Sequence, residues 1–365
     1  MSLPDLNLIK KVLIIRLSSI GDVVHALPVA SALGKAHPHL QITWLVEEMS
    51  APIVVGHKYL HEVIVIPRGR WKANRGSSQT WREYLSLLSK LRHERFDLSI
   101  DLQGYSKSAI FAAAASAKHR LGWQYLKDGA AIVSQPAPKR AASRHRVEYY
   151  LDTLAALGVD TSNPTFDLYI PSEAHEKIAS LLTKHLLVDK PFIAINPATG
   201  DKFRRWGSDQ FVDLAVGLAE KLGTRSVFLG SNKDQGLCES ITSRANVLIE
   251  TSMQTVSVAG ETDLKSLAAL LTKAKLHVSG DTGSLHIAAA LGTHVVGLYG
   301  PTDPVYAGPF GQLERCFSGY SRCSSSCMKG RCSQMRNIDS DEIAPCLLST
   351  SSAQVLLLID RLIHG

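Results

Sequence analysis

A turn formed by Asp281, Thr282 and Gly283 has the residue types of an anion-binding site. It follows a predicted buried strand at 275–278 and precedes an Ala-rich helix at 284–291. The first N–H groups of a helix lack internal partners, and the helix dipole favours negative charge there. Further groups that could face the same anion are the hydroxyl of Ser284 and the imidazole of His286. The alternative is a helix whose first residues only satisfy its own backbone groups.

A second carboxylate of interest, Asp22, follows the first predicted strand. Residues 12–17 are a continuous apolar and β-branched run, typical of a central parallel strand, and a helix follows the turn at 18–25. That turn has one glycine, Gly21, so it matches neither the three-glycine dinucleotide motif nor a P-loop. Open α/β sheets bind ligands at the carboxyl ends of their strands. Asp22 is therefore a candidate general base, and a simple helix N-cap is the alternative.

The second half of the chain repeats the anion-binding pattern after another buried strand, at 192–197. The residues that follow this strand include a hydroxyl and two guanidinium groups, from Thr199, Arg204 and Arg205. Asp234 follows the turn after a further strand at 226–230. Both features lie where an α/β sheet places its ligands.

Basic residues recur at the ends of elements in the first half. A loop at 67–75 contains several of them beside Trp71, Lys107 precedes a buried segment at 109–117, and others lie at 139–140 and 144–146. Such charges are usually solvated, but their position after strands makes contact with an acidic substrate a comparable interpretation. The candidates for acceptor binding are Arg68, Arg70, Lys72, Lys107 and Arg144.

Length and composition set the broad class. A chain of 365 residues fits two domains of ordinary size, and 45% hydrophobic and 20% charged residues describe a globular protein. The net charge of +7 suggests an acidic partner such as a nucleotide, a phosphate or an anionic lipid. Apolar runs of the roughly 18 residues that a membrane span requires do not occur. We therefore expect a cytoplasmic protein, with peripheral contact at the inner membrane as a possibility.

Strand and helix patterns alternate in both halves, which predicts two α/β domains, each with a parallel sheet. The pattern relaxes at 156–172, where glycine, asparagine and proline accumulate. We predict an N-terminal domain at 1–170, a C-terminal domain at 171–345 and a final helix within 346–365 that packs back on a domain face.

Five of the six cysteines crowd the C-terminal region. Their spacing departs from the usual metal-binding pairs and no histidine lies nearby, so structural or surface thiols are favoured over metal or redox roles. These five are Cys316, Cys323, Cys327, Cys332 and Cys346.

A carboxylate and cations in one half, with anion sites in the other, suit transfer from a nucleotide-activated donor. Such a transfer requires a base for the acceptor hydroxyl and cations or N–H groups for the departing diphosphate. The competing interpretation is a non-catalytic protein that binds anions or nucleic acid. This interpretation rests only on the net charge, since the sequence has no interleaved basic and aromatic stripe. We therefore expect no nucleic-acid partner.

Motifs along nearly the whole chain resemble glycosyltransferase family 9, the lipopolysaccharide heptosyltransferases. They are RLSSIGDVVH at 16–25, DLQGYSKS at 101–108, NPATG with RRW at 196–206, GDTGSLHIAAA at 280–290 and YGPTDP at 299–304. The segments WLVEE at 44–48 and LGWQ at 121–124 resemble heptosyltransferase I. The family implies a GT-B fold, with two Rossmann-like domains facing across a cleft.

The resemblance also implies an activity and a set of site residues. It implies inverting transfer, without metal or cofactor, of a heptose from ADP-L-glycero-D-manno-heptose to a Kdo-lipid A inner-core acceptor of a Gram-negative bacterium. Asp22 matches the catalytic base and Thr199 and Arg204 match diphosphate contacts, although many members have lysine in place of Arg204. The other expected donor contacts are Arg205, Asp234, Thr262, Asp281, Thr282, Gly283 and His286. The cysteine-rich tail departs from heptosyltransferase I, so types II and III and other sugar nucleotides remain alternatives.

Overall fold

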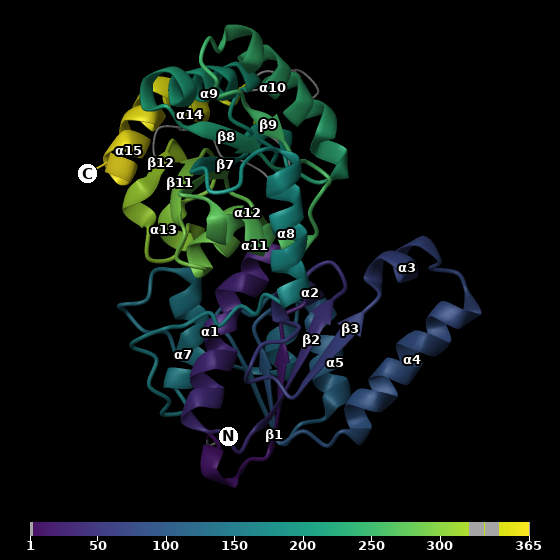
Figure 1. Ribbon diagram of the computed structural model, residues 1–365. Helices are drawn as coiled ribbons and strands as arrows, with labels where there is room; N and C mark the ends of the chain where they lie inside the picture. The colour runs from purple at the N-terminus through teal and green to yellow at the C-terminus, as the bar shows by residue number, and fades with distance from the viewer. Residues whose placement is uncertain (1–2, 321–331, 333–342, 365) are drawn as a thin grey trace. The chain divides into compact units, whose positions relative to one another are not determined.

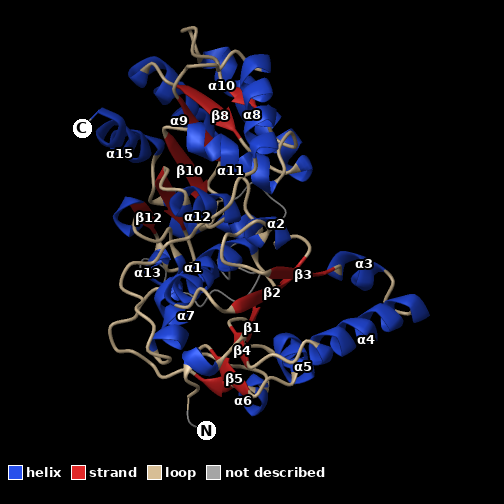
Figure 2. Ribbon diagram, turned by 60° about the horizontal axis from the view of Figure 1, so that its bottom comes forward, coloured by secondary structure: helices blue, strands red, loops and turns tan. Residues whose placement is uncertain are grey.

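A computed structural model describes residues 3–320, 332 and 343–364 of the chain. The chain divides into two compact units, Met1–Tyr169 and Ile170–Gly365. Each unit contains one six-stranded parallel sheet with helices on both faces (Figures 1 and 2).

The sheet of the first unit has the strand order β3-β2-β1-β4-β5-β6. Its strands are β1 (Lys11–Ile15), β2 (Gln41–Glu47), β3 (Glu62–Ile66), β4 (Leu98–Asp101), β5 (His119–Gly122) and β6 (Gln135–Pro136). Its helices are α1 (Ile20–Ala36), α2 (Ala51–Val54), α3 (Arg68–Ala73), α4 (Ser78–His93), α5 (Ser106–Ala115), α6 (Ala130–Val133) and α7 (Arg146–Ala155).

Strand β1 lies inside this sheet, between β2 and β4, and its apolar residues are covered on both faces. Val12, Leu13, Ile14 and Ile15 are all fully buried, as expected for a β-branched run in a parallel sheet. Helices α1 and α7 pack together on one face, and α4 and α5 pack together on the other (Figure 1). The carboxyl end of β1, from which four residues lead into α1, is therefore held from both sides.

The sheet of the second unit has the strand order β12-β11-β10-β7-β8-β9. Its strands are β7 (Phe192–Asn196), β8 (Arg225–Phe228), β9 (Val256–Ser257), β10 (Leu276–Gly280), β11 (His294–Tyr299) and β12 (Cys316–Ser318). Its helices are α8 (Ser172–Lys184), α9 (Ser208–Leu222), α10 (Gln235–Leu248), α11 (Leu264–Lys273), α12 (Gly283–Ala290), α13 (Pro304–Ala307), α14 (Pro345–Leu348) and α15 (Ser352–His364).

The last helix, α15, packs against α9 of the second unit. Val355 and Ile359 are fully buried in the core of that unit. A Cβ atom at Gly217 would lie 2.8 Å from the Leu356 side chain, so the glycine permits the close approach of the two helices.

The predicted architecture of two α/β domains with parallel sheets is confirmed. One local expectation was wrong, because the basic segment after β3 is not a loop throughout but contains the short helix α3. Its first residue follows Pro67, and proline is well tolerated just before a helix. Among the described helices, none is long and apolar enough to cross a membrane.

Candidate functional site

Asp22 lies in the first turn of α1, directly after the carboxyl end of β1. Its carboxylate accepts hydrogen bonds from the backbone N–H of Ser19, at 3.4 Å, and from the Ser19 hydroxyl, at 3.2 Å. It also forms ion pairs with Arg16 and Arg146, whose side chains are 4% and 23% exposed. The interpretation of Asp22 as the helix N-cap was wrong, because the N-cap of α1 is Ser19 and Asp22 is the N3 residue of its capping box. Asp22 is also a partly exposed, ion-paired carboxylate, and its role as a base stays a prediction.

The loop after β4 supports this turn. Asp101 is fully buried and accepts hydrogen bonds from the N–H groups of Gln103 and Gly104, each at 2.9 Å, and burial raises its pKa. Gln103 in turn accepts from the N–H groups of Leu17, at 3.1 Å, and Ser18, at 3.2 Å. The side chain of Gln103 therefore fixes the backbone just before Asp22.

Lys107, at the start of α5, reaches the same turn. Its ammonium lies 3.2 Å from the Ser18 hydroxyl and 3.6 Å from Glu47 at the end of β2. Arg68 pairs with the same Glu47 oxygen at 3.3 Å. Burial lowers the pKa of Lys107; the charge of Glu47 opposes this effect and that of Arg68 adds to it. Lys107 and Arg68 thus form one positive cluster with Glu47, close to the Asp22 turn.

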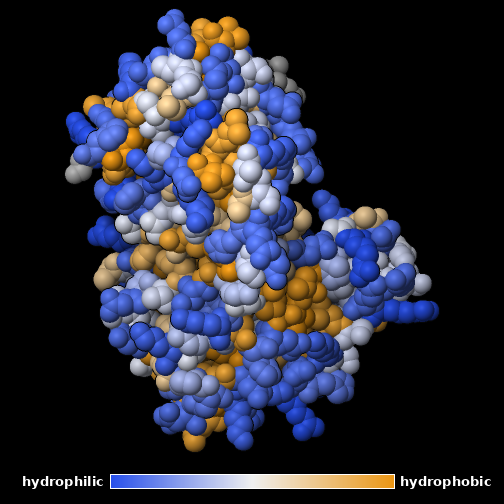
Figure 3. Space-filling model, viewed as in Figure 1, coloured by the Kyte–Doolittle hydropathy of each residue, from blue (hydrophilic) through white to orange (hydrophobic). Residues whose placement is uncertain are grey.

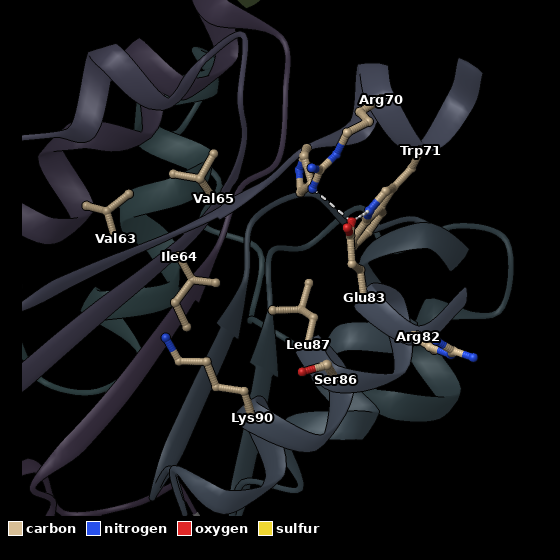
Figure 4. A pocket seen from close by; sticks show the side chains of 11 residues that line it. Val63, Ile64, Val65, Arg70, Trp71, Arg82, Glu83, Ser86, Leu87 and Lys90 are labelled. Atoms are coloured by element: carbon tan, nitrogen blue, oxygen red, sulfur yellow. Dashed lines mark hydrogen bonds and ion pairs between the residues drawn. The ribbon is translucent and has the colours of Figure 1, made fainter. Parts of the chain in front are cut away.

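Arg70 is not part of the cluster formed by Lys107, Arg68 and Glu47. It pairs with Glu83 of α4 at 2.8 Å, and the Trp71 indole donates to the same carboxylate oxygen at 2.9 Å (Figure 4). Arg70 and Trp71 line a groove of about 590 Å³ between β3 and α4. The wall of this groove also includes Val65 and Leu87. Figure 3 shows apolar surface gathered beside the α3–α4 segment.

Two other predicted acceptor residues have exposed side chains. Lys72 lies in the last turn of α3, and Arg144 precedes α7. The backbone N–H of Arg144 donates to Glu148 at 2.7 Å, while the nearby Arg146 is the residue that contacts Asp22. The structure therefore brings together Asp22, Lys107 and Arg68 but not Arg70, Lys72 or Arg144.

In the second unit, the turn after β10 leads into the N-terminus of α12. Thr282 is the N-cap residue, and among the described residues its side chain makes no capping hydrogen bond to the helix. Its hydroxyl instead bonds to those of Ser279, at 2.8 Å, and Ser284, at 2.9 Å. The backbone donors of Gly283 and the next residues are thus left for an anion.

Asp281 lies between two cationic or donor groups. Arg204 pairs with one carboxylate oxygen at 3.0 Å, and His286 approaches the other at 3.5 Å. Burial favours the neutral acid, but the hydrogen bond and charge of His286 and the charge of Arg204 hold the pKa of Asp281 below its usual value. Asp281 thus remains ionised and orients Arg204 beside the helix N-terminus.

Thr199 lies against the end of β10. Its hydroxyl donates to the carbonyl of Asp201 at 2.7 Å. A Cβ atom at Gly280 would approach the Thr199 methyl group to 3.0 Å and the Arg204 carbonyl to 3.6 Å. A glycine at 280 therefore lets the segment that contains Thr199 and Arg204 pack directly on the α12 turn, and these predicted donor residues come together.

The remaining predicted donor residues are Asp234, Arg205 and Thr262. Asp234 accepts from the N–H and hydroxyl of Ser231, at 2.8 and 2.6 Å, and so caps its own turn after β8. Arg205 is half-buried. Burial raises the pKa of the Cys238 thiol of α10; the charge of Asp234 adds to this rise and the charge of Arg205 opposes it. Thr262 lies half-buried in the segment before α11.

The described cysteines are buried or half-buried. Cys332 and Cys346 belong to the hydrophobic core of the second unit, and burial raises the pKa of Cys316 to about 12. No group of three or more potential metal ligands occurs among the described residues. Cys323 and Cys327 lie outside the described residues.

Sequence reasoning did not select several residues that shape these sites. Arg16, Gln103 and Glu47 lie inside quoted motifs, so the signal was present, but a motif does not show which side chain faces which. Arg146 and His277 carried no signal beyond being polar residues next to, or inside, predicted elements.

Two parallel-sheet units, with a candidate catalytic carboxylate in one and a candidate anion site in the other, are the arrangement expected for a glycosyltransferase. The chain matches glycosyltransferase family 9 (heptosyltransferase) over residues 84–336, and it belongs to that family. It is a glycosyltransferase of the heptosyltransferase type that acts in lipopolysaccharide core biosynthesis. The predicted family, fold and enzyme class are thereby confirmed.

Lipopolysaccharide heptosyltransferases of both type 1 and type 2 are similar to the chain. Lipopolysaccharide heptosyltransferase 1 of Salmonella typhimurium is 30% identical over 312 residues, covering 83% of this chain and 92% of that protein. Lipopolysaccharide heptosyltransferase 2 of Escherichia coli is 26% identical, covering 86% and 90%.

Solved structures agree on the fold. The glycosyl transferase family 9 structure from Veillonella parvula has a TM-score of 0.79 at 22% identity, covering 100% of this chain and 98% of that chain. E. coli heptosyltransferase WaaC with ADP has a TM-score of 0.67 at 26% identity, covering 84% and 92%.

Proposed function

We propose that the enzyme transfers L-glycero-D-manno-heptose from its ADP derivative to a Kdo-lipid A type acceptor, with inversion at the anomeric carbon. The observation that carries this proposal is the anion site of the second unit, where Arg204 and the uncapped N-terminus of α12 lie together. The ADP and the fluorinated ADP-heptose in structures of the E. coli relative support an adenine nucleotide as the donor.

In this proposal the second unit holds the donor. The N–H groups of Gly283 and Ser284 and the guanidinium of Arg204 bind the diphosphate and stabilise the charge that develops as it leaves. Thr199, on the same segment as Arg204, is a further proposed contact of the diphosphate. Asp234, Thr262 and Arg205 are proposed contacts of the ribose, the adenine and the phosphates, carried over from the family resemblance.

Asp22 is the proposed base. It takes the proton of the acceptor hydroxyl while the acceptor oxygen bonds to the anomeric carbon of the heptose and the bond from that carbon to the phosphate oxygen breaks. The proton ends on Asp22 and the electron pair on ADP. Arg16 and Arg146 hold the carboxylate in place.

The first unit is the proposed acceptor side. Kdo is an acidic sugar, so cations near Asp22 would bind its carboxylates. Lys107 and Arg68 are the best-placed candidates, because they lie with Glu47 next to the Asp22 turn. Arg70, Lys72 and Arg144 remain proposed contacts of more distant acidic groups of the acceptor.

We favour heptosyltransferase I, which adds the first heptose, on the WLVEE and LGWQ segments. The type II reaction, which adds heptose to heptose, is the alternative, since relatives of both types have similar identities. A donor with another base is a further alternative.

Two measurements test the proposal. Calorimetric titration with ADP, UDP and GDP should give binding of ADP alone, and a preference for UDP or GDP would overturn the donor. Transfer assays should then give product from ADP-heptose with Kdo-lipid A but not with an acceptor that already has one heptose. The opposite acceptor preference would assign the chain to type II.

A further inference from the structure

His277 is a fully buried histidine in β10, one of the two central strands of the second unit's sheet. Its Nδ1 lies 3.1 Å from the carbonyl oxygen of Ala194 on the neighbouring strand β7, and its Nε2 lies 3.0 Å from the Ser284 hydroxyl on α12. The imidazole thus connects the sheet to the first turn of the helix that forms the proposed diphosphate site.

These contacts fix the tautomer of His277. A carbonyl oxygen only accepts, so Nδ1 must be protonated and donate to Ala194. Burial lowers the pKa of His277 to about 4, so the ring is neutral at physiological pH and Nε2 has no proton. Nε2 therefore accepts the hydrogen bond of the Ser284 hydroxyl.

The tautomer in turn fixes the direction of a chain of hydroxyl groups. Ser284 has one hydroxyl proton, which it gives to His277, so its other two contacts must be donors to it. The Asn196 amide donates at 3.0 Å, and its oxygen accepts from the N–H of Ala198 at 3.1 Å, which agrees with this direction. The Thr282 hydroxyl must also donate to Ser284, at 2.9 Å, and then accept from Ser279, at 2.8 Å.

This direction determines what α12 presents at its N-terminus. A threonine N-cap usually turns its hydroxyl oxygen toward the N–H groups of its own helix. Here Thr282 is drawn instead toward Ser279 and Ser284, and it makes no such bond within the described residues. Because the proton of Thr282 points inward, the donors that remain for an anion are the backbone N–H groups.

We propose that His277 is a positioning residue for the donor diphosphate. By accepting from Ser284, it keeps Thr282 from capping its own helix and leaves the first N–H groups of α12 open for the phosphate oxygens. This inference rests on the proposed binding of the diphosphate at α12. His277 itself does not contact the diphosphate in this proposal; it acts on the site through Ser284 and Thr282.

The test compares ADP with adenosine in calorimetric titrations of the full-length protein. The His277→Phe variant keeps the ring volume but neither hydrogen bond. It should bind ADP at least about fivefold more weakly, the worth of one hydrogen bond, with unchanged adenosine affinity. The His277→Gln variant should restore part of the ADP affinity, because an amide offers both a donor and an acceptor.

A second pair of variants covers the case in which His277→Phe fails to fold. Ser284→Ala breaks the same link at the helix and should give the same selective loss of ADP affinity. Ser226→Ala removes a buried hydroxyl from β8 of the same sheet and is the matched control, with no expected effect on either ligand. Equal ADP affinity in Ser284→Ala and Ser226→Ala would overturn the proposal.

Two further outcomes separate this inference from the proposed function. Wild-type protein that binds no ADP would refute the donor assignment itself. Wild-type protein that binds ADP, with an Nε2-protonated His277 in its nitrogen-15 NMR spectrum, would refute the direction of the chain and hence the role of His277 alone.

Discussion

The guanidinium of Arg204 and the carboxylate of Asp281 form an ion pair at 3.0 Å, although 77 positions separate them in the chain. The two residues follow β7 and β10, which are neighbours in the sheet, so the carboxyl ends of these strands bring them together. A carboxylate beside a phosphate site would ordinarily repel the ligand. Here Arg204 and His286 flank Asp281, and the carboxylate holds the cation at the place that we propose for the diphosphate.

Replacing Arg204 should weaken donor binding. Because a charge-assisted hydrogen bond contributes about 1.5–3 kcal/mol, Arg204→Ala should raise the Kd for ADP about 10- to 100-fold. Arg204→Lys keeps the charge but not the planar fork, so its loss should be smaller. Calorimetric titration measures both, with Arg244→Ala on α10 as the control, since Arg244 pairs with Asp209 at the surface. Unchanged ADP affinity in Arg204→Ala would remove Arg204 from the donor site.

Replacing Asp22 should affect turnover and leave donor binding intact. Asp22→Asn keeps the shape but not the basicity, and general-base catalysis contributes about 10²- to 10⁴-fold to a rate. We expect kcat to fall by that order, with the Kd for ADP nearly unchanged. The exposed Asp213 of α9 provides the control variant Asp213→Asn. Near-normal turnover in Asp22→Asn would exclude Asp22 as the base.

Arg146 and Arg144 allow a paired comparison two residues apart. Arg146 contacts Asp22, whereas the side chain of Arg144 is exposed. Arg146→Gln should therefore reduce kcat about tenfold or more, because Asp22 loses a partner that holds it in position and a misplaced reacting group slows the reaction steeply. Arg144→Gln should have a smaller effect, confined to the KM for the acceptor. Steady-state kinetics decide this, and equal losses in the two variants would contradict the assignment of Arg146 to Asp22.

Acid should destabilise the protein through His277. Its pKa falls from 6.5 to about 4 on folding, because burial disfavours the charged ring. Between these values the unfolded chain binds one more proton than the folded protein, so stability falls as the pH falls from about 6.5 to about 4 and this contribution is constant below that. The loss is roughly 3 kcal/mol for such a shift.

The matched variant for this measurement is His277→Gln, which has no titrating ring. Denaturant unfolding at several pH values should show wild type losing stability relative to the variant across that window. The carboxylates of Asp97 and Asp263, whose pKa values are about 2, are common to both proteins and cancel in the difference. A difference that does not change with pH would show that His277 titrates normally.

The sequence alone was sufficient for the architecture. The fully buried run of β1 and the strand–turn–helix around Asp281 are local patterns, because hydrophobic periodicity and turn residues depend on neighbours in the chain. The segment with α3 was less predictable, since a short helix rich in charged residues has little apolar periodicity to reveal it.

The sequence by itself also selected the segments that we propose to carry the chemistry, because motifs place particular side chains at the ends of strands. Only the tertiary structure decided the pairings within those segments: Asp22 with Arg16 and Arg146, Arg204 with Asp281, and His277 with Ser284. Such pairings depend on strand order and register, which bring distant parts of the chain within a few ångströms. Hydrogen-bond and ion-pair partners are set by those distances, and no local pattern encodes them.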